Sequence, residues 1–182
     1  KGPGIKAASR VNGNTYLMDV LPTLCDIAGI DIPGTCEGIS FFNILKGEAE
    51  MNRNIIYGAF CIRRIDPITG ALHPSNPGIR AVRYGDWKLI KYDVYEGQVH
   101  EKQLFNLKDN PYELLTEHHD PSIVQLTGNK PESFQVNLAD DPNYKDKLEE
   151  MEKLLLEQQF KYNDPLLLWD YEDILIKMNL KN

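Results

Sequence analysis

The sequence predicts an α+β fold in which a small four-stranded antiparallel sheet packs against a C-terminal helix. Four short segments rich in β-branched and aromatic residues follow one another with short connections, which is typical of antiparallel pairing. A long amphipathic segment follows them, and a shorter helical segment precedes them. We therefore expect one sheet with a helix on one of its faces, joined to a helical segment at the start of the chain.

The first expected helix covers residues 20–28. Asp19 is a suitable N-cap, since its carboxylate can accept from the free N–H groups of the first turn. Pro22 lies in that first turn, where a missing N–H costs little. Gly29 lies at the C-terminal position that favours a left-handed backbone. A short helical turn is expected over residues 41–45, ending at Gly47.

The four expected strands are residues 54–61, 79–84, 87–94 and 103–107. Gly85-Asp86 is typical of a two-residue hairpin loop between the second and the third. The third strand should alternate two sets across its faces: Trp87, Leu89 and Lys91 on one, Lys88, Ile90 and Tyr92 on the other. Both sets include apolar side chains, so a helix should cover one face. An exposed loop is expected over residues 65–78.

The covering helix is expected at residues 144–160, capped by Asp140 or Asp141. Its apolar stripe consists of Leu148, Met151, Leu154 and Leu155. A short helix is expected at 121–126. Asp164-Pro165 should end the long helix, and the apolar run 166–169 must then dock against the fold. Residues 170–182 form either a last helix or a frayed tail.

The charge distribution limits the partners. The 182-residue chain has a net charge of −7. Residues 1–100 carry 11 basic and 10 acidic side chains, whereas residues 101–182 carry 9 and 17. This acidic end argues against nucleic acid as a partner, and no apolar run approaches the ~20 residues of a membrane span. Residues 51–100 are the basic part, so an anionic ligand would bind there.

Metal and disulfide sites are not indicated. Cys25, Cys36 and Cys61 are odd in number and lack zinc-ligand spacing, so free thiols are expected. His118-His119 are adjacent and point apart, with no third ligand at metal spacing. Asp140-Asp141 precede a proline at a helix start, where a capping role explains them better than a metal. Trp87 is expected in the core and Trp169 as a docking anchor rather than as sugar platforms.

An ordered set of motifs resembles the sulfatase family. Sulfatases carry a D-x-x-P-T-L…A-G-I…P…G-x-S-x…L-x-G pattern late in their large domain. The matching residues here are Met18 to Leu24, Ala28-Gly29-Ile30, Pro33, Gly38 to Phe41 and Leu45-Lys46-Gly47. Further pieces follow in sulfatase order: Arg80 to Ile90, Leu104 to Leu107, Asn110 to Glu113 and Asn137 to Pro142. Each piece alone is weak, but the ordered set is specific and covers nearly the whole chain.

The resemblance implies a domain organisation. Residues 1–47 would be the end of an alkaline-phosphatase-like α/β domain, and residues 48–182 a C-terminal sulfatase subdomain with an extended tail at 163–182. The abrupt start at Lys1 looks like a cut within a longer protein. The expected partner is then an upstream sulfatase catalytic domain, and self-association of the fragment is expected if the helix of 20–28 lacks its sheet. The family also implies an extracytoplasmic location, periplasmic or secreted.

The family's chemistry implies Ca²⁺ and a formylglycine made from Cys or Ser in a C/S-x-P-x-R motif. Cys61-Ile62-Arg63-Arg64 is the nearest segment, and it lacks the proline. The catalytic nucleophile and metal ligands are therefore expected upstream, with no cofactor in this fragment and no activity from it alone.

The substrate-contact candidates are Arg63, Arg64, His73 and Arg80. With Arg83, they form a basic set on two expected strands and the loop between them. Guanidinium groups suit sulfate, and loops on a rigid sheet often carry binding residues. Salt bridges to the acidic C-terminal part are the competing interpretation. A sulfated carbohydrate is the preferred substrate by family breadth. The alternative function is a non-catalytic carbohydrate- or protein-binding module.

Overall fold

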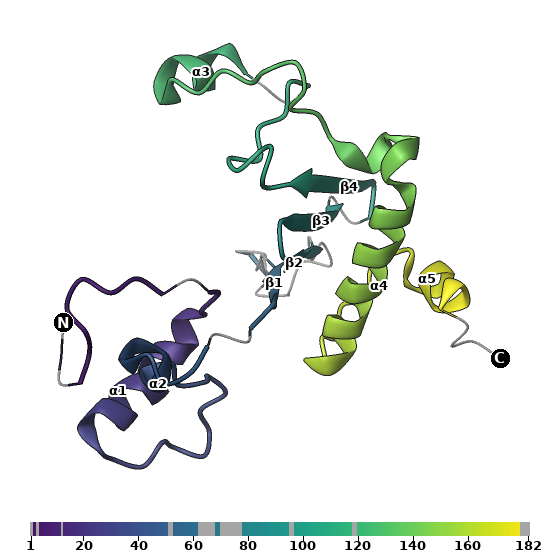
Figure 1. The fold of residues 1–182 in the computed structure, drawn as a ribbon. Coiled ribbons are helices and arrows are strands. Elements are labelled where there is room, and N and C mark those ends of the chain that lie inside the picture. The colour runs from purple at the N-terminus through teal and green to yellow at the C-terminus, as the bar shows by residue number, and fades with distance from the viewer. Residues whose placement is uncertain are drawn as a thin grey trace. The chain divides into compact units, whose positions relative to one another are not determined.

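The computed structural model describes residues 2, 4–11, 13–50, 53–61, 68–69, 78–94, 97–117 and 120–178. The chain divides into two compact units, Lys1–Ile56 and Tyr57–Asn182. Figure 1 shows the helices and strands of both. The assignment of residues 1–47 to a larger α/β domain stays a prediction. Most of the loop expected over 65–78 lies outside the described residues.

Unit 1 contains two short helices that end as the sequence predicts. α1 (Val20–Ala28) ends at Gly29, whose φ of 67° is left-handed. α2 (Phe42–Lys46) ends in the same way at Gly47, with φ of 81°. The apolar side chains of α1 are largely exposed among the described residues, including Leu21 and Leu24.

The predicted capping role of Asp19 is wrong. Asp19 closes a 3₁₀ turn, Leu17–Asp19, and has helical dihedral angles of its own, so its side chain points back along the chain. Asp19 is buried, with 2% of the residue exposed. It accepts hydrogen bonds from the backbone N–H groups of Tyr16 (2.7 Å) and Ile39 (2.8 Å), and it pairs with Arg53 (2.8 Å). Asp19 therefore ties three segments of unit 1 together.

Two more motif residues, Thr23 and Gly38, link two of these segments, the start of α1 and the chain around residues 38–41. The Thr23 hydroxyl donates to the Asp19 carbonyl (2.6 Å) and accepts from the Phe41 N–H (3.0 Å). Gly38 lies so close to the turn before α1 that a Cβ there would be 2.1 Å from the carbonyl oxygen of Met18. The D-x-x-P-T-L and G-x-S pieces of the pattern thus meet in one hydrogen-bonded junction.

Unit 2 is built on a four-stranded sheet in the order β1-β2-β3-β4. The strands are β1 (Ile55–Cys61), β2 (Gly78–Tyr84), β3 (Trp87–Val94) and β4 (Val99–Asn106). β3 pairs antiparallel with both β2 and β4. β4 begins earlier than predicted, because the polar start of this strand pairs through its backbone with the end of β3 and gives no hydrophobic pattern.

Helix α4 (Lys145–Lys161) packs across one face of the sheet, as Figure 1 shows. The core between them is fully buried and consists of Val82, Leu89 and Leu104 from the strands and Met151, Leu155 and Leu156 from the helix. Leu156 rather than the predicted Leu154 completes the buried stripe, because the helix is rotated slightly from the expected orientation. Each buried side chain of this kind contributes about 1.5–3 kcal/mol.

The segment before α4 caps the turn that leads into this helix and forms hydrogen bonds with the edge of β4. Asp141 accepts from the Asn143 N–H (2.9 Å) and so caps the 3₁₀ turn Pro142–Tyr144 that leads into α4. Asn137 lies at the outer edge of β4. Its side-chain amide accepts a hydrogen bond from the Leu104 N–H (3.0 Å) and donates one to the Lys102 carbonyl (2.8 Å). This side chain substitutes for a further strand, which protects the edge from pairing with another chain.

Two further helices complete the described chain. α3 (Pro121–Thr127) forms where a short helix is predicted. For residues 170–182 the sequence left open either a last helix or a frayed tail, and the structure has a helix there, α5 (Tyr171–Lys177). The apolar run before α5 docks as predicted, with Leu168 buried.

Candidate functional site

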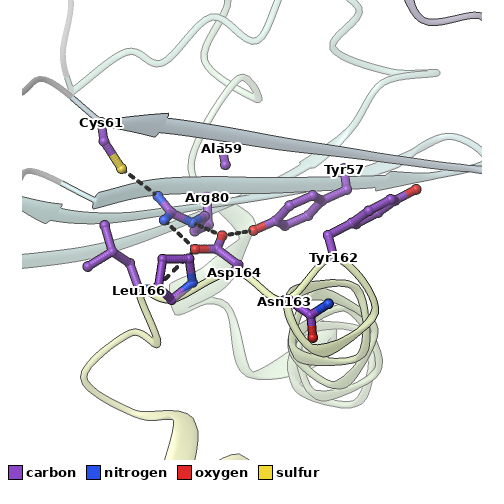
Figure 2. A pocket seen from close by; sticks show the side chains of 9 residues that line it. Tyr57, Ala59, Cys61, Arg80, Tyr162, Asn163, Asp164 and Leu166 are labelled. Carbon is purple, nitrogen blue, oxygen red and sulfur yellow. Dashed lines mark hydrogen bonds and ion pairs between the residues drawn. The ribbon is translucent and has the colours of Figure 1, made fainter. Parts of the chain in front are cut away.

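The candidate site is centred on a buried ion pair between β2 and the turn after α4. Arg80, which is 2% exposed, binds the Asp164 carboxylate through Nε (2.5 Å) and Nη2 (2.8 Å). The hydroxyl of Tyr57, on β1, also donates to Asp164 (Figure 2). The backbone N–H of Leu166 donates to the same carboxylate at 3.0 Å. Asp164 is therefore held from several sides.

The end of α4 brings Asp164 to this place. Asn163 has a left-handed φ of 50°. The Asn163 N–H donates a hydrogen bond to the Phe160 carbonyl (3.1 Å), and the Asp164 N–H donates one to the Gln159 carbonyl (2.9 Å). This pair of bonds is the Schellman arrangement, with asparagine in the place usually taken by glycine. Pro165 prevents a further helical turn, so the chain turns from the helix onto the sheet.

An open cavity of about 450 Å³ lies beside the ion pair. Tyr57, Ala59 and Cys61 alternate along β1 and so share the face of the strand that lines it. Ala59 and Cys61 are small, which leaves the space open, and Tyr162 to Leu166 form the opposite wall (Figure 2). The volume lies within the range of small-molecule sites.

Two tyrosines form the aromatic part of this cavity. The rings of Tyr57 and Tyr162 are stacked, with centroids 5.6 Å apart and planes 14° from parallel. Tyr162 is 45% exposed, so the stacked pair reaches the surface. Figure 2 shows both rings on the same side of Asp164.

The ionisation states at the ion pair are fixed by its contacts. Burial raises the pKa of Tyr57, and the hydrogen bond to Asp164 raises it further. Burial alone would raise the pKa of Asp164, but the hydrogen bonds from Arg80 and Tyr57 hold it below its usual value. Burial opposes the charge of Arg80 as well, yet the bond to Asp164 leaves the Arg80 pKa raised. At neutral pH the pair is therefore ionised, with no net charge.

Arg80 is the first member of a row of cations across the sheet. It lies opposite Lys91 on β3, which lies opposite Lys102 on β4. Three carboxylates face the row: Asp164, Asp170 and Glu152. Lys91 binds Asp170 at 2.6 Å, and Lys102 binds Glu152 at 2.5 Å and Asp170 at 2.8 Å. The three cations and three carboxylates balance in charge. Because Asp164 and Asp170 belong to the segment after α4, these ion pairs hold that segment against the sheet.

Trp169 packs beside the same row. Its ring stacks on that of His100, with centroids 4.4 Å apart, and lies 5.3 Å from the Lys91 ammonium. This agrees with the predicted docking role. A second hollow next to it, about 460 Å³, is lined by three carboxylates, Glu101, Glu117 and Asp140, together with Lys102 and His100. The Lys102 ammonium is already paired with Glu152 and Asp170, so the three carboxylates would repel an anionic ligand.

The structure places only part of the predicted contact set. Arg63, Arg64 and His73 lie outside the described residues. Arg80 lies at the cavity, with its guanidinium bonded to Asp164. Arg83 lies elsewhere on β2 and donates to the Gly85 carbonyl at 3.1 Å. Sequence reasoning missed Asp164 and Tyr162 as members of the site; the only signal was the Asn-Asp-Pro end of α4.

Among the described residues, no three His, Cys, Asp or Glu side chains are grouped so as to hold a metal ion. His118 and His119 lie outside that part of the chain. The three cysteines, all described, are free. Within the described chain, no helix is both long enough and apolar enough to span a lipid bilayer.

The sheet with its single long helix, and the motif junction that precedes it, define the C-terminal part of a sulfatase. Residues 3–138 match the family described as N-sulphoglucosamine sulphohydrolase, C-terminal. The chain therefore belongs to this sulfatase family. This confirms the resemblance found in the sequence, and the α+β fold agrees with it.

Individual relatives are also sulfatases. The chain is 36% identical to arylsulfatase K of Mus musculus over 115 residues, which are 62% of this chain and 20% of that protein. It is 30% identical to a delta 4,5-hexuronate-2-O-sulfatase of Bacteroides thetaiotaomicron over 128 residues, covering 69% of this chain and 24% of the relative. The chain thus spans about a fifth to a quarter of the length of these two relatives.

Solved structures show the same fold. A 2-O GAG sulfatase matches with a TM-score of 0.54 and 26% identity, over 85% of this chain and 26% of that one. A protein solved with its substrate, D-glucosamine-2-N,6-O-disulfate, matches with a TM-score of 0.59 and 23% identity, over 88% and 27%.

Proposed function

We propose that this chain is the C-terminal part of an enzyme that hydrolyses sulfate esters of a sulfated glycosaminoglycan, and that it forms one wall of the substrate cleft. The observation that carries the proposal is the family match over residues 3–138. Relatives and structural neighbours whose names include a hexuronate sulfatase and a GAG sulfatase support the substrate class.

The reaction centre belongs, in this proposal, to the part of the enzyme that precedes these residues. The sequence contains no C/S-x-P-x-R segment from which a formylglycine could be made. The described residues also do not fit a calcium site. Formylglycine and Ca²⁺ are properties of the family that this chain would depend on and not supply.

The proposed substrate contacts are Arg63, Arg64 and His73. The chain enters their segment at Cys61, the last residue of β1, which lines the cavity. Arg80 is proposed to act at the same place, through its hold on Asp164 rather than through a free guanidinium. A charged hydrogen bond from one arginine to a sulfate would contribute about 1.5–3 kcal/mol.

The test uses the full-length protein and two substrates, a sulfated glycosaminoglycan oligosaccharide and a small aryl sulfate. Arg63→Ala or Arg64→Ala should lower kcat/KM on the oligosaccharide by roughly 10-fold or more. The aryl sulfate should lose less, since it cannot reach this wall. Lys153→Ala, a change at an exposed position of α4, is the matched control and should change neither value.

The outcomes separate the alternatives. An equal loss on both substrates would indicate folding damage, and no loss on either would place these arginines in surface salt bridges. Sulfatase turnover by the 182-residue chain alone would contradict the assignment of the reaction centre to another part of the enzyme. A full-length protein that binds the oligosaccharide without turnover would favour the binding-module alternative.

A further inference from the structure

We propose that the cavity beside Arg80 and Asp164 binds an unsulfated sugar ring of the glycan, and not one of its sulfate groups. The cavity would then be a subsite that recognises a neighbouring sugar unit, next to the unit that carries the scissile sulfate. This inference rests on the proposed function, since it assumes that the chain lines a glycan-binding cleft.

The charge balance argues against sulfate. The Arg80 guanidinium already binds both oxygens of Asp164, and that carboxylate also accepts from Tyr57 and Leu166. A sulfate entering the cavity would meet this carboxylate as well as the guanidinium. It would lose water without gaining an uncompensated cation, which is unfavourable for an anion. The pair is thus the neutral floor of the cavity.

Among the described residues, one further cation lies close to the cavity. The Lys161 ammonium is 5.1 Å from the centroid of the Tyr162 ring. Lys161 is exposed, and an exposed lysine contributes little to the binding of an anion because water and salt screen it. Lys161 therefore does not make the cavity favour a sulfate group over a neutral sugar ring.

The cavity walls suit a sugar ring. Sugar rings present apolar C–H faces, and Tyr57 and Tyr162 supply an aromatic wall that reaches the exterior. Tyr57 covers one face of the Tyr162 ring and the exposed Lys161 side chain lies over the ring, so a sugar would displace Lys161 to stack there. The electron-rich faces of aromatic rings attract the partly positive hydrogens of such C–H groups. Ala59 leaves room for the ring between Tyr57 and Cys61.

A polar group for the sugar hydroxyls stands at the end of α4. The left-handed position in this kind of helix end is usually glycine, but here it is Asn163, an exposed residue that lines the cavity and whose amide could turn toward a bound sugar. An amide both donates and accepts hydrogen bonds, as a hydroxyl requires. Figure 2 shows Asn163 on the wall opposite Ala59. The site thus combines an aromatic surface, a neutral floor and a hydroxyl-binding amide.

The experiment titrates the 182-residue chain with two probes and follows backbone amide shifts by NMR. The probes are an unsulfated glucosamine–uronate disaccharide and the same disaccharide with N- and 6-O-sulfates. Both should shift the amides of Tyr57, Ala59, Cys61 and Asn163, with dissociation constants that agree within about threefold.

Three variants test the site itself. Tyr162→Ala should weaken the binding of both probes by about tenfold or more. Phe60→Ala is the matched control: Phe60 is a comparably exposed aromatic (54%) that points away from the cavity side of β1, and its loss should leave binding unchanged. Ala59→Leu places a larger side chain in the cavity from an exposed position of β1, and it should also abolish the shifts.

Several results would overturn the inference. These are tenfold tighter binding of the sulfated probe at the cavity, shifts that map elsewhere, and absence of binding by either probe. Its failure is distinguishable from failure of the proposed function. A full-length sulfatase whose activity on the oligosaccharide is unchanged in Tyr162→Ala would refute the subsite alone. A full-length protein without sulfatase activity, whose cavity still binds the unsulfated disaccharide, would refute the enzymatic role alone.

Discussion

Asp164→Asn should destabilise unit 2 strongly, because it removes the charge that compensates Arg80. Arg80 is almost fully buried, and Asp164 is its only carboxylate partner among the described residues. Asparagine has nearly the same shape but offers one acceptor oxygen and no charge. The guanidinium would then be a buried cation without a counter-ion.

The magnitude follows from that burial. Removing one partner of a buried ion pair typically costs about 3–5 kcal/mol. Domains of this size unfold with about 5–15 kcal/mol in total, so the loss is a large share of the stability. With a urea m-value of about 2 kcal/mol/M, a loss of 3 kcal/mol moves the unfolding midpoint by about 1.5 M.

Urea unfolding followed by tryptophan fluorescence measures this change, because both tryptophans, Trp87 and Trp169, lie in unit 2. The control is Glu150→Gln, which breaks an exposed helix pair with Lys147 and should cost at most about 1 kcal/mol. Replacing Arg80 and Asp164 together by leucine should recover most of the loss. A cost below about 1 kcal/mol for Asp164→Asn would refute the reasoning, since an uncompensated buried charge costs more than that.

Two further predictions concern other parts of the chain. The pKa of Asp170 is lowered, since its lysine partners outweigh its burial, so its stabilisation is complete above the unfolded pKa of about 3.9 and is lost as the pH falls through the folded value. The unfolding free energy of unit 2 should therefore fall between about pH 5 and 2, less steeply in Asp170→Asn; equal slopes in both would contradict this. Gly38→Ala should destabilise unit 1 by about 1–3 kcal/mol, because the new Cβ would overlap the Met18 carbonyl. Gly34→Ala, with open space around it, is the control, and equal resistance of the two variants to limited proteolysis would contradict the prediction.

Local signals predicted most of the elements. Gly29 and Gly47 end their helices because a left-handed backbone favours glycine, and this is a property of one position. The hairpin at Gly85-Asp86 forms for the same kind of local reason. The start of β4 and the exact stripe of α4 were less predictable, since both depend on pairing and packing with other elements.

The roles of the charged side chains were the least predictable. Asp19 precedes a helix and so looked like a cap, but its partners Ile39 and Arg53 lie 20 and 34 positions further on. The charge of Arg80 predicts a ligand contact, whereas its partner Asp164 is 84 positions away. No pattern within a helix or a strand identifies such pairs, because the fold alone brings them together.

The ion pair formed by the turn after α4 constrains the length of this helix. Met151 and Leu155 set the rotation of α4 on the sheet, and Asp164, which follows just after the end of the helix, must still meet Arg80. One inserted residue would rotate everything beyond it by about 100° and advance it by about 1.5 Å. The length of α4 therefore determines where Asp164 lies relative to the buried core and the cavity. Insertions and deletions between Leu155 and Asp164 should therefore not be tolerated.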